Sequence, residues 1–435
     1  MRARTAISLA CVLALAAAAC GSQAESGRVT RAPADLTNGF AEVVVPLPTR
    51  QSPMVVAAGD HVVVFGGYRF AGNTQTPRGD GADYDIAKGE WMAMSPAPFD
   101  RPLYQAAGVW TGREVIVIGT PCGATTTEME LARCAHATVA AAAYSPSRHS
   151  WRALRSPPRS RFPWVAKGAP LGAGGLGWAG NAAVFEIYDG EPYRQNLLLD
   201  PEAETWTFAP PLKFASTFSV TGGHLVAGVI GETAPNVGFG TATPGSPLPP
   251  VRAITLSNDH RRWTESASAS RGGPTPMFDR VYRAPGVLMY ASILPPPTGF
   301  DAGGLWYEPD ARRWAELPSF AAAGFPGEMS PAELDGTRLV WLGGTVGLDA
   351  IERSGPTSQP QVQTSRRVST PATDGQLFVL PRGSTAWLRP KPPIAGPVSI
   401  SALDQLLLVI PSGRLGAKRM KIGLLDLNRL PRPEK

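Results

Sequence analysis

The sequence predicts an all-β fold in which similar small sheets repeat around an axis, and three observations support this prediction. First, an octamer recurs six times: a large apolar residue, six mostly polar residues and then a tryptophan. Second, successive octamer tryptophans are 60, 55, 57, 51 and 73 residues apart, and a period near 50 residues is typical of repeated β units. Third, no stretch shows convincing helical periodicity. The octamers are Tyr84–Trp91, Tyr144–Trp151, Leu199–Trp206, Leu256–Trp263, Tyr307–Trp314 and Leu380–Trp387.

Residues 1–19 are predicted to be a signal peptide. Arg2 and Arg4 give the segment a positive start, and the run from Ile7 to Ala19 is almost wholly apolar. This run is too short to cross a bilayer, whereas a positive start before a short apolar stretch is typical of export signals. We therefore expect the protein to leave the cytoplasm.

Cys20 is the predicted point of membrane attachment. It follows three alanines and precedes Gly21, which resembles the lipobox of bacterial lipoproteins, in which the cysteine is lipidated and becomes the mature N-terminus. The resemblance implies a lipid anchor that holds the protein at a membrane surface. Ala17 departs from the pattern, which usually has leucine at that place. Cleavage at the A-x-A site Ala16–Ala18, which would release a soluble protein, is the alternative.

Residues 20–38 have few large apolar side chains, and we expect them to form a flexible tether after the lipidated cysteine. The 416 residues that follow the signal peptide are many for one compact core, but a ring of repeats reaches this length because each unit adds its own small core. Loss of Arg2 and Arg4 lowers the formal charge from +6 to +4. Because no run of lysine and arginine reaches five residues, we expect no nucleic-acid partner.

Two cysteines remain in the exported domain, Cys122 and Cys134, twelve residues apart. Because such a pair is usually oxidised in an exported protein, we expect a disulfide between them. Adding His136 would give a rival zinc site, but three ligands without C-x-x-C spacing match zinc poorly. We therefore expect no metal and no cofactor.

Each repeat follows the same order of elements. A first strand leads through a hairpin, such as Val109–Glu114, into an apolar run that ends in glycine. Such runs are Val62–Phe65 before Gly66-Gly67, Val115–Ile118 before Gly119, and Leu339–Leu342 before Gly343-Gly344. After a variable loop the octamer closes the unit. Its apolar head ends the third strand, its polar middle turns, and its tryptophan opens the fourth strand.

This order resembles the kelch repeat, the four-stranded blade of a β-propeller. Its marks are an apolar run with a glycine pair, a tyrosine, and a tryptophan a few residues later. Tyrosine heads the octamers at Tyr84, Tyr144 and Tyr307, while leucine replaces it in the other three, and the glycine pair is intact only at 66–67 and 343–344. The resemblance covers residues 40–430. It implies that the octamer tryptophans pack against the neighbouring blade.

Seven blades are predicted, with six or eight as alternatives. Six octamers define six units, and three more strands are expected after Trp387 with no tryptophan behind them. These strands are Val398–Leu403, Leu406–Ile410 and Lys421–Leu427. Phe40–Leu47 reads as a strand without a local partner, so this N-terminal strand could close the last blade and leave the ring without an open edge. The propeller domain is then residues 39–430, followed by a tail at 431–435.

Three long loops are expected between the strands, at Glu232–Pro250, Ile293–Gly304 and Thr345–Gly375. Long loops on a rigid scaffold often carry function. The polar composition of the third loop fits disorder equally well.

Histidines and acids give little support for catalysis. We expect each of the five histidines to face solvent. None has a second histidine at metal-ligand spacing, which argues against a metal cluster or a histidine-based triad. They are His61, His136, His149, His224 and His260. Glu328, Glu333 and Asp335 lie close together and could serve glycoside chemistry, but Pro331–Gly336 is typical of an ordinary hairpin.

Basic residues recur in the connections before the first strands of five units, where a propeller lines the mouth of its central channel. They are Arg50, Arg101, Arg161, Lys213 and Arg271, with aromatic residues nearby at Tyr104, Phe162, Trp164, Phe214 and Phe278. A ring of cations with aromatic walls would suit an anionic or sugar-like ligand. The alternative is that the basic residues only cover blade edges.

The sequence therefore predicts a lipid-anchored extracytoplasmic propeller that acts as a binding scaffold at the bacterial cell envelope. Its partner would be an envelope protein or an anionic or sugar-like ligand. An enzyme that acts on carbohydrate or another small polar substrate in the channel is the alternative, and it rests on fold analogy alone. A structural or sensory subunit of a membrane complex is a third hypothesis.

Overall fold

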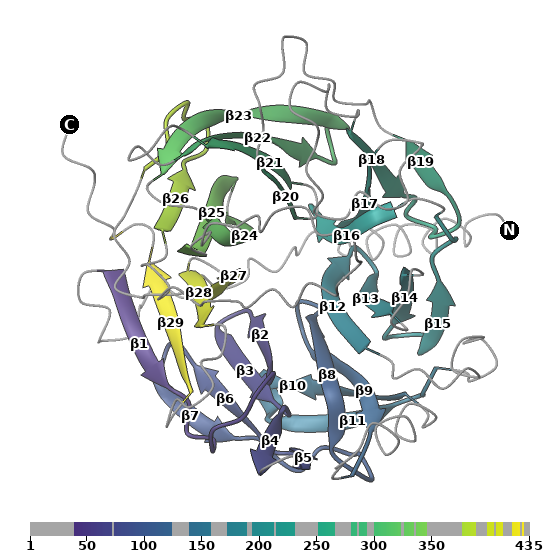
Figure 1. The fold of residues 1–435 in the computed structure, drawn as a ribbon. Helices are drawn as coiled ribbons and strands as arrows, with labels where there is room; N and C mark the ends of the chain where they lie inside the picture. The colour runs from purple at the N-terminus through teal and green to yellow at the C-terminus, as the bar shows by residue number, and fades with distance from the viewer. Residues whose placement is uncertain are drawn as a thin grey trace, which may run out of the picture.

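The computed structural model is an all-β propeller, with its sheets arranged around a central axis (Figure 1). Six sheets have four strands each and form six blades, which agrees with the predicted propeller architecture. The structure describes residues 39–71, 74–123, 139–157, 172–188, 194–212, 215–230, 251–265, 280–284, 287–293, 300–322, 326–334, 336–345, 376–388, 398–403, 406–411, 420–426 and 429.

Five blades follow one another along the chain. Blade 1 contains β2, β3, β6 and β7, and blades 2 to 5 contain β8–β11, β12–β15, β16–β19 and β20–β23. The sixth, here called the terminal blade, combines β27, β28 and β29 with β1 from the opposite end of the domain. A three-stranded sheet, β24–β26, lies between blade 5 and the terminal blade, because β24 contacts both β20 and β27.

Within each sheet the strands run in chain order from the axis outward, except that β1 is the outer strand of the terminal blade. The innermost strands are β2 (Met54–Ala58), β8 (Leu103–Trp110), β12 (Gly172–Ala179), β16 (Ala215–Thr221), β20 (Arg280–Ala284), β24 (Pro326–Leu334) and β27 (Val398–Leu403). The second strands are β3 (His61–Phe65), β9 (Val115–Pro121), β13 (Ala182–Tyr188), β17 (His224–Ile230), β21 (Val287–Ile293), β25 (Thr337–Thr345) and β28 (Leu406–Pro411). The third strands are β6 (Gly81–Asp85), β10 (Ala140–Ser145), β14 (Arg194–Asp200), β18 (Val251–Leu256), β22 (Phe300–Glu308), β26 (Gln376–Leu380) and β29 (Lys421–Asp426). The outer strands are β7 (Glu90–Ala93), β11 (Ser150–Leu154), β15 (Thr205–Phe208), β19 (Trp263–Glu265), β23 (Arg313–Ala322) and β1 (Phe40–Val44).

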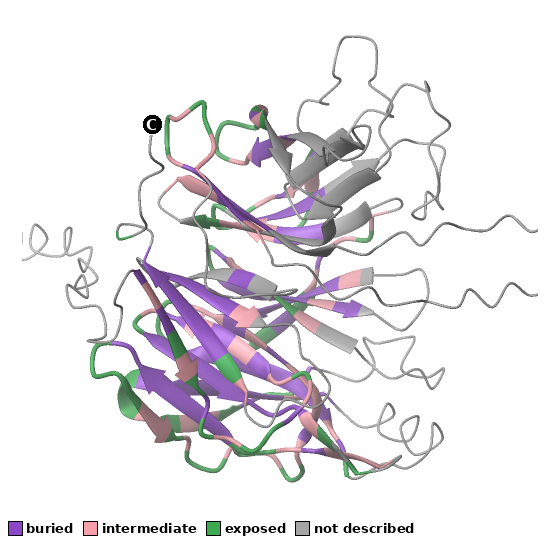
Figure 2. Cartoon of the chain, turned by 60° about the vertical axis from the view of Figure 1, so that its left-hand side comes forward, coloured by how far each residue is buried: buried purple, intermediate pink, exposed green. Residues whose placement is uncertain are grey.

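The second strands are the most apolar because both of their faces are covered by neighbouring blades. Every residue of β3 is buried, and so are the first six residues of β9. A strand covered on both faces loses the usual alternation of polar and apolar residues, which explains the continuous apolar runs in the sequence. Figure 2 shows the buried residues concentrated in the middle of the blades and exposed residues at the turns.

The innermost strands approach one another closely, and glycine permits this approach. A Cβ atom on Gly175 of β12 would lie 2.1 Å from the carbonyl oxygen of Gly108 of β8. A Cβ atom on Gly108 would in turn lie 2.4 Å from the sulfur of Met54 on β2. Any larger residue at either place would push adjacent blades apart.

The octamer forms the turn between the third and fourth strands. Its head and its tryptophan lie opposite each other in the antiparallel register, as Tyr144 and Trp151 do with ring centroids 5.0 Å apart. The fifth residue after the head often has left-handed backbone, at Gly89 (φ 71°), His149 (49°), Glu204 (49°) and Arg312 (50°). Only glycine takes this conformation without a steric cost.

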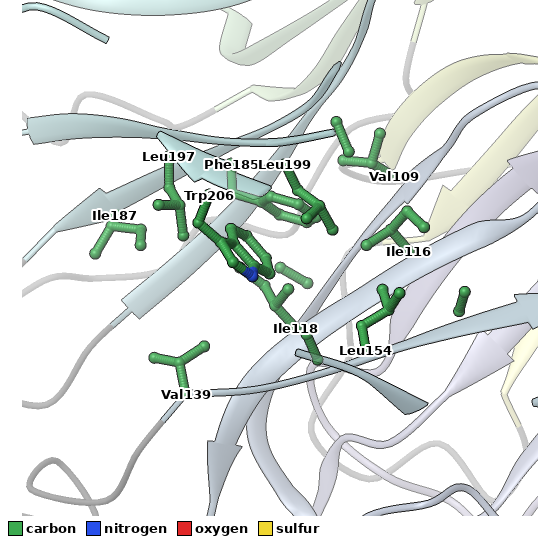
Figure 3. Close-up of a cluster of buried hydrophobic side chains, with 14 residues drawn as sticks. Val109, Ile116, Ile118, Val139, Leu154, Phe185, Ile187, Leu197, Leu199 and Trp206 are labelled. Carbon is green, nitrogen blue, oxygen red and sulfur yellow. The ribbon is translucent and has the colours of Figure 1, made fainter. Parts of the chain in front are cut away.

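The octamer tryptophans join neighbouring blades, as the kelch resemblance implied. In four of the six octamers the indole Nε1 donates to the backbone oxygen of the residue four places after the tryptophan of the preceding octamer. The donors and acceptors are Trp151 to Ser95 (3.0 Å), Trp206 to Arg155 (2.7 Å), Trp263 to Pro210 (2.7 Å) and Trp387 to Pro318 (2.7 Å). Around Trp206, side chains from blades 2 and 3 form one apolar cluster that includes Ile118 and Phe185 (Figure 3).

The strands predicted at both ends of the domain are present, and β1 pairs with β29 from Phe40 opposite Leu425 to Val44 opposite Lys421. The prediction of a long loop at Ile293–Gly304 is wrong in part, because Ile293 ends β21 and Phe300–Gly304 belong to β22. Those residues follow prolines and include two glycines, which concealed the strand. Most of the other two long loops lies outside the described residues.

Candidate functional site

Arg50 fixes the chain that leads into the innermost strand of blade 1. Only 1 % of its side chain is exposed. Its guanidinium donates to the backbone oxygens of Pro48 (3.1 Å), Gly66 (3.1 Å) and Asp80 (3.2 Å) and to both carboxylate oxygens of Asp80 (3.1 and 2.8 Å). Burial tends to raise the pKa of Asp80, but the hydrogen bonds and charge of Arg50 hold it below its ordinary value. This pair ties the loop between β3 and β6 to the start of blade 1.

The predicted ring of cations is described at only two of its positions. Arg50 uses its donors inside the protein, so it offers no guanidinium to a ligand. Arg101 is exposed in the connection before β8. The other three, Arg161, Lys213 and Arg271, lie outside the described residues, as do Phe162, Trp164, Phe214 and Phe278. A ligand site made by this ring stays a prediction.

Four other residues come together where the innermost strands of blades 1 and 2 begin. We call Ser52, Tyr68, Tyr104 and Gln105 the mouth cluster. The rings of Tyr68 and Tyr104 are nearly parallel, at 20°, with centroids 6.5 Å apart. Ser52 Oγ lies 3.4 Å from the hydroxyl of Tyr68, and Gln105 Nε2 donates to the hydroxyl of Tyr104 at 3.5 Å. Both tyrosines are partly exposed, and Ser52 is exposed.

The backbone at the mouth cluster is irregular. Ser52 and Gln105 have left-handed backbone, with φ of 46° and 48°. The register of β8 against β9 shifts between Tyr104 and Ala107, and the innermost strands of blades 3 and 4 shift likewise at 175–177 and 215–217. Bulges and left-handed residues other than glycine cost energy, and they concentrate at sites where a strand must redirect a side chain.

The glycine pair after β3 places Tyr68. Gly66 and Gly67 have φ of 70° and 82°, and a Cβ atom on Gly67 would lie 2.7 Å from the backbone oxygen of Gln51. Gln51 and Tyr68 then exchange two backbone hydrogen bonds, of 2.8 and 3.0 Å. Tyr68 begins a hairpin of β4 (Tyr68–Ala71) and β5 (Thr74–Pro77) that lies outside the blade repeat. The sequence pattern pointed to Tyr104 but not to Tyr68. The glycine pair directly before Tyr68 was the one feature of the sequence that could have indicated it.

A second polar group lies between blades 1 and 2. We call His61, Asp83, Tyr144 and His149 the inter-blade cluster. Asp83 is fully buried, and its two carboxylate oxygens lie 2.8 Å from His61 Nδ1 and 3.0 Å from the donating hydroxyl of Tyr144. His149 Nδ1 lies 3.4 Å from both that hydroxyl and the carboxylate. A buried carboxylate needs such partners, because an isolated one would be strongly destabilising.

The expectation that His61 faces solvent is wrong, because only 8 % of the surface of this residue is exposed. Burial tends to lower the pKa of His61, but the hydrogen bond to Asp83 and the surrounding carboxylates of Asp83, Asp60 and Asp85 outweigh burial and raise it. Burial and the nearby Asp83 raise the pKa of Tyr144, so that its hydroxyl keeps its proton and donates to Asp83. Sequence spacing gave no sign of this cluster, because its members come from two blades.

The described residues contain no group of three or more histidine, cysteine or acidic side chains placed to hold a metal ion. Within the same ranges, no helix has the length and apolar character needed to cross a membrane. Glu333 accepts a hydrogen bond from Trp306 Nε1 at 3.0 Å, which is a structural contact, and Asp335 lies outside the described residues. Cys20 and Cys134 also lie outside them.

No protein-family model matches the chain, and no curated protein matches it. Several solved structures are distantly similar. An uncharacterized protein, lmo1340 of Listeria monocytogenes EGD-e, is 10 % identical over 90 % of this chain and 99 % of its own, with a TM-score of 0.45. Trypanosoma rangeli sialidase is 11 % identical over 90 % of this chain and 60 % of its own, with a TM-score of 0.44. A puromycin-hydrolyzing peptidase of Mycobacterium tuberculosis is 12 % identical over 89 % of this chain and 53 % of its own, with a TM-score of 0.44. Likenesses this distant carry no argument about activity.

Proposed function

We propose that the protein is a lipid-anchored extracytoplasmic propeller that binds a partner at the bacterial cell envelope through the mouth cluster. The observation that carries the proposal is the pairing of Tyr68 with Tyr104, two partly exposed rings brought together from the β4–β5 hairpin and from β8 of blade 2. Tyrosine offers a large apolar area and a polar tip, and loop residues displayed on a rigid scaffold are typical of recognition surfaces. Asp80, the carboxylate in the loop that follows Tyr68, is engaged by Arg50, which favours binding over acid–base catalysis there.

We further infer that the ring has seven kelch-like blades, with the β24–β26 sheet as the seventh. Its octamer behaves like those of blades 2, 3 and 4, because Trp387 donates to Pro318 of the preceding blade. Val379 and Leu388 exchange hydrogen bonds of 2.9 and 2.7 Å, which is the start of a fourth strand. The pairing of β1 with β29 would then close the ring. An experimental structure with six or eight sheets around the axis would contradict this count.

The anchor is proposed at Cys20. Phe40 lies opposite Leu425, at the end of the terminal blade where β27 turns into β28. The mouth cluster precedes β2 and follows β3, at the opposite end of blade 1 from its β2–β3 turn. The tether from Cys20 would therefore enter the propeller at the end of the blades opposite the mouth cluster. Metabolic labelling with a clickable palmitate tests the anchor: wild type should be labelled and Cys20→Ser should not, whereas equal labelling would contradict the site.

A disulfide between Cys122 and Cys134 is proposed next to the same mouth. Cys122 is 1 % exposed, and its amide donates to the backbone oxygen of Pro102 at 2.8 Å, just before β8. The disulfide would hold the loop after β9 near Tyr104. Peptide mapping without reductant should recover the two cysteines in one linked species, and two free thiols would contradict the pairing.

Crosslinking capture from the native envelope tests the binding function. Tagged wild-type protein should retain a stoichiometric partner, protein or glycan, that is lost from Tyr68→Ala and Tyr104→Ala and kept by Arg113→Ala. Arg113 is the matched control because it is exposed in the β8–β9 turn, at the other end of β8 from Tyr104. A partner retained equally by all variants, or no partner, would contradict binding through the mouth cluster.

A further inference from the structure

We propose that the inter-blade cluster is a pH-sensitive latch that holds the octamer turn of blade 2, residues 145–150, against blade 1. The latch is closed when the histidines of the cluster carry protons, and it opens as they lose them. Asp83 is its fixed point, because its carboxylate is fully buried and lies 2.8 Å from His61 Nδ1. The latch does not depend on the proposed binding function. It lies near the β2–β3 turn, at the opposite end of blade 1 from the mouth cluster.

His149 makes two contacts that join the octamer turn of blade 2 to blade 1. Its Nδ1 lies 3.4 Å from the carboxylate of Asp83, and its backbone oxygen accepts a 3.3 Å hydrogen bond from Ser95 Oγ. Tyr144, directly before the turn, donates to the same carboxylate at 3.0 Å. His149 has left-handed backbone, with φ of 49°, which costs energy in any residue that has a side chain. A strained turn that depends on one buried carboxylate is the element we expect to move when the cluster loses its protons.

The charges around the latch favour its protonated form. Three carboxylates and one lysine of blade 1 surround it: Asp60, Asp83, Asp85, and Lys88, which is paired with Asp85. They leave two negative charges uncompensated when both histidines are neutral, and a proton on each histidine compensates them. On the blade 2 side, the guanidinium of Arg148 donates to Glu114 at 3.0 Å.

The direction of the pH response follows from His61. Burial tends to lower the pKa of His61, but the hydrogen bond to Asp83 and the nearby carboxylates outweigh burial and raise it above 6.5. The ion pair between His61 and Asp83 is therefore fully formed below pH 6.5 and is lost as the pH rises through the folded-state pKa. Without that proton, a buried carboxylate keeps its charge without a cationic partner, which is strongly unfavourable. The latch thus opens toward alkaline pH.

The junction between blades 4 and 5 has the same arrangement without the buried charge. Thr255 stands where Asp83 stands, one residue before the head of its octamer, and its Oγ1 lies 3.2 Å from the hydroxyl of Tyr307 in the next blade. His224, in the place of His61, pairs instead with an aspartate whose side chain is 85 % exposed. An uncharged partner therefore suffices to hold the tyrosine. The buried carboxylate between blades 1 and 2 is thus not needed for packing, which favours a role as a switch.

Hydrogen exchange of the full-length protein at pH 6 and pH 8, read peptide by peptide and corrected for the intrinsic effect of pH, tests the latch. Protection of the amides in Tyr144–Trp151 should fall at least about three-fold from pH 6 to pH 8. The blade 5 octamer, Tyr307–Trp314, is the internal control and should keep its protection. Asp83→Thr, which copies the neutral junction, should remove the pH response. His224→Gln should leave the response as it is in wild type.

Three outcomes would overturn the proposal: unchanged protection at both octamers, an equal fall at both, or a wild-type response in Asp83→Thr. An equal fall at both would mean a loss of global stability without local opening. His149→Gln is the second variant if Asp83→Thr does not fold, because 38 % of the His149 side chain is exposed and its replacement should disturb the fold less. It should weaken the response at Tyr144–Trp151, and an unaltered response would then overturn the latch.

Discussion

The indole of Trp151 in blade 2 donates a 3.0 Å hydrogen bond to the backbone oxygen of Ser95, which lies four residues after Trp91 of blade 1. The same four-residue offset recurs at Trp206, Trp263 and Trp387. The tryptophan side chain of one repeat thus donates to a backbone oxygen at a fixed position of the repeat before it. This contact requires a tryptophan at the same place in successive repeats, which explains why the octamer recurs in the sequence although the rest of each repeat varies.

Trp151→Phe should lower the free energy of unfolding by about 2–3 kcal/mol. The change removes one hydrogen bond and leaves a void beside Phe65 and Tyr144, whose rings lie 5.2 and 5.0 Å away. Trp91→Phe is the matched control, because the buried Nε1 of Trp91 has no acceptor among the described residues. In urea unfolding, Trp91→Phe should lower the free energy of unfolding by about 1 kcal/mol less than Trp151→Phe does. Equal losses would mean that the inter-blade hydrogen bond contributes nothing.

The inter-blade cluster should make stability depend on pH. The pKa of His61 is raised in the fold above its ordinary value of 6.5. A group of this kind stabilises fully below its unfolded pKa and loses its contribution as the pH rises through its folded pKa. The melting temperature of the wild type should therefore fall as the pH rises from about 6.5, and His61→Gln should flatten that part of the profile.

Asp83→Asn provides the second variant at the same site. It removes the buried negative charge that raises the pKa of His61, and it should cost about 3 kcal/mol because two partners lose a charged acceptor. It should also flatten the pH profile above 6.5. A wild-type melting temperature that is constant from pH 6 to 8 would contradict the role given to the cluster.

Arg312→Gly should raise the free energy of unfolding by about 0.5–1 kcal/mol. Arg312 has left-handed backbone, with φ of 50°, at the octamer position where Gly89 stands in blade 1. Glycine adopts this conformation without the steric cost that arginine bears. The converse change, Gly89→Ala, should destabilise by about 1 kcal/mol in the same assay. A lower free energy of unfolding in Arg312→Gly would contradict this prediction and would mean that contacts of the arginine side chain stabilise the turn.

Arg50 and Arg101 occupy similar places in the sequence but should respond differently to substitution. Arg50→Lys should destabilise by about 2–3 kcal/mol, since a lysine cannot replace donors that reach three backbone oxygens and the Asp80 carboxylate. Arg101→Lys should change stability by less than about 0.5 kcal/mol, because the residue is exposed. Thermal unfolding of both variants distinguishes a structural arginine from a surface one.

The octamers and apolar runs predicted the blades because each pattern follows from a local contact. The head of an octamer lies opposite its own tryptophan, so their spacing is fixed by one turn, as at Tyr84 and Trp91. The burial of Arg50 could not be predicted, because its partner Asp80 lies 30 residues away across a variable loop. The inter-blade cluster was missed for the same reason, since Asp83 and Tyr144 are 61 residues apart.

The binding role of the mouth cluster is the central claim, and site-specific photo-crosslinking in intact cells tests it most directly. Benzoylphenylalanine would replace Tyr104, or Arg113 as the control at the other end of β8, in the full-length lipoprotein. The account predicts a discrete adduct, stained as protein or as carbohydrate, from position 104 and none from position 113. Equal adducts from both positions, or none from position 104, would contradict it.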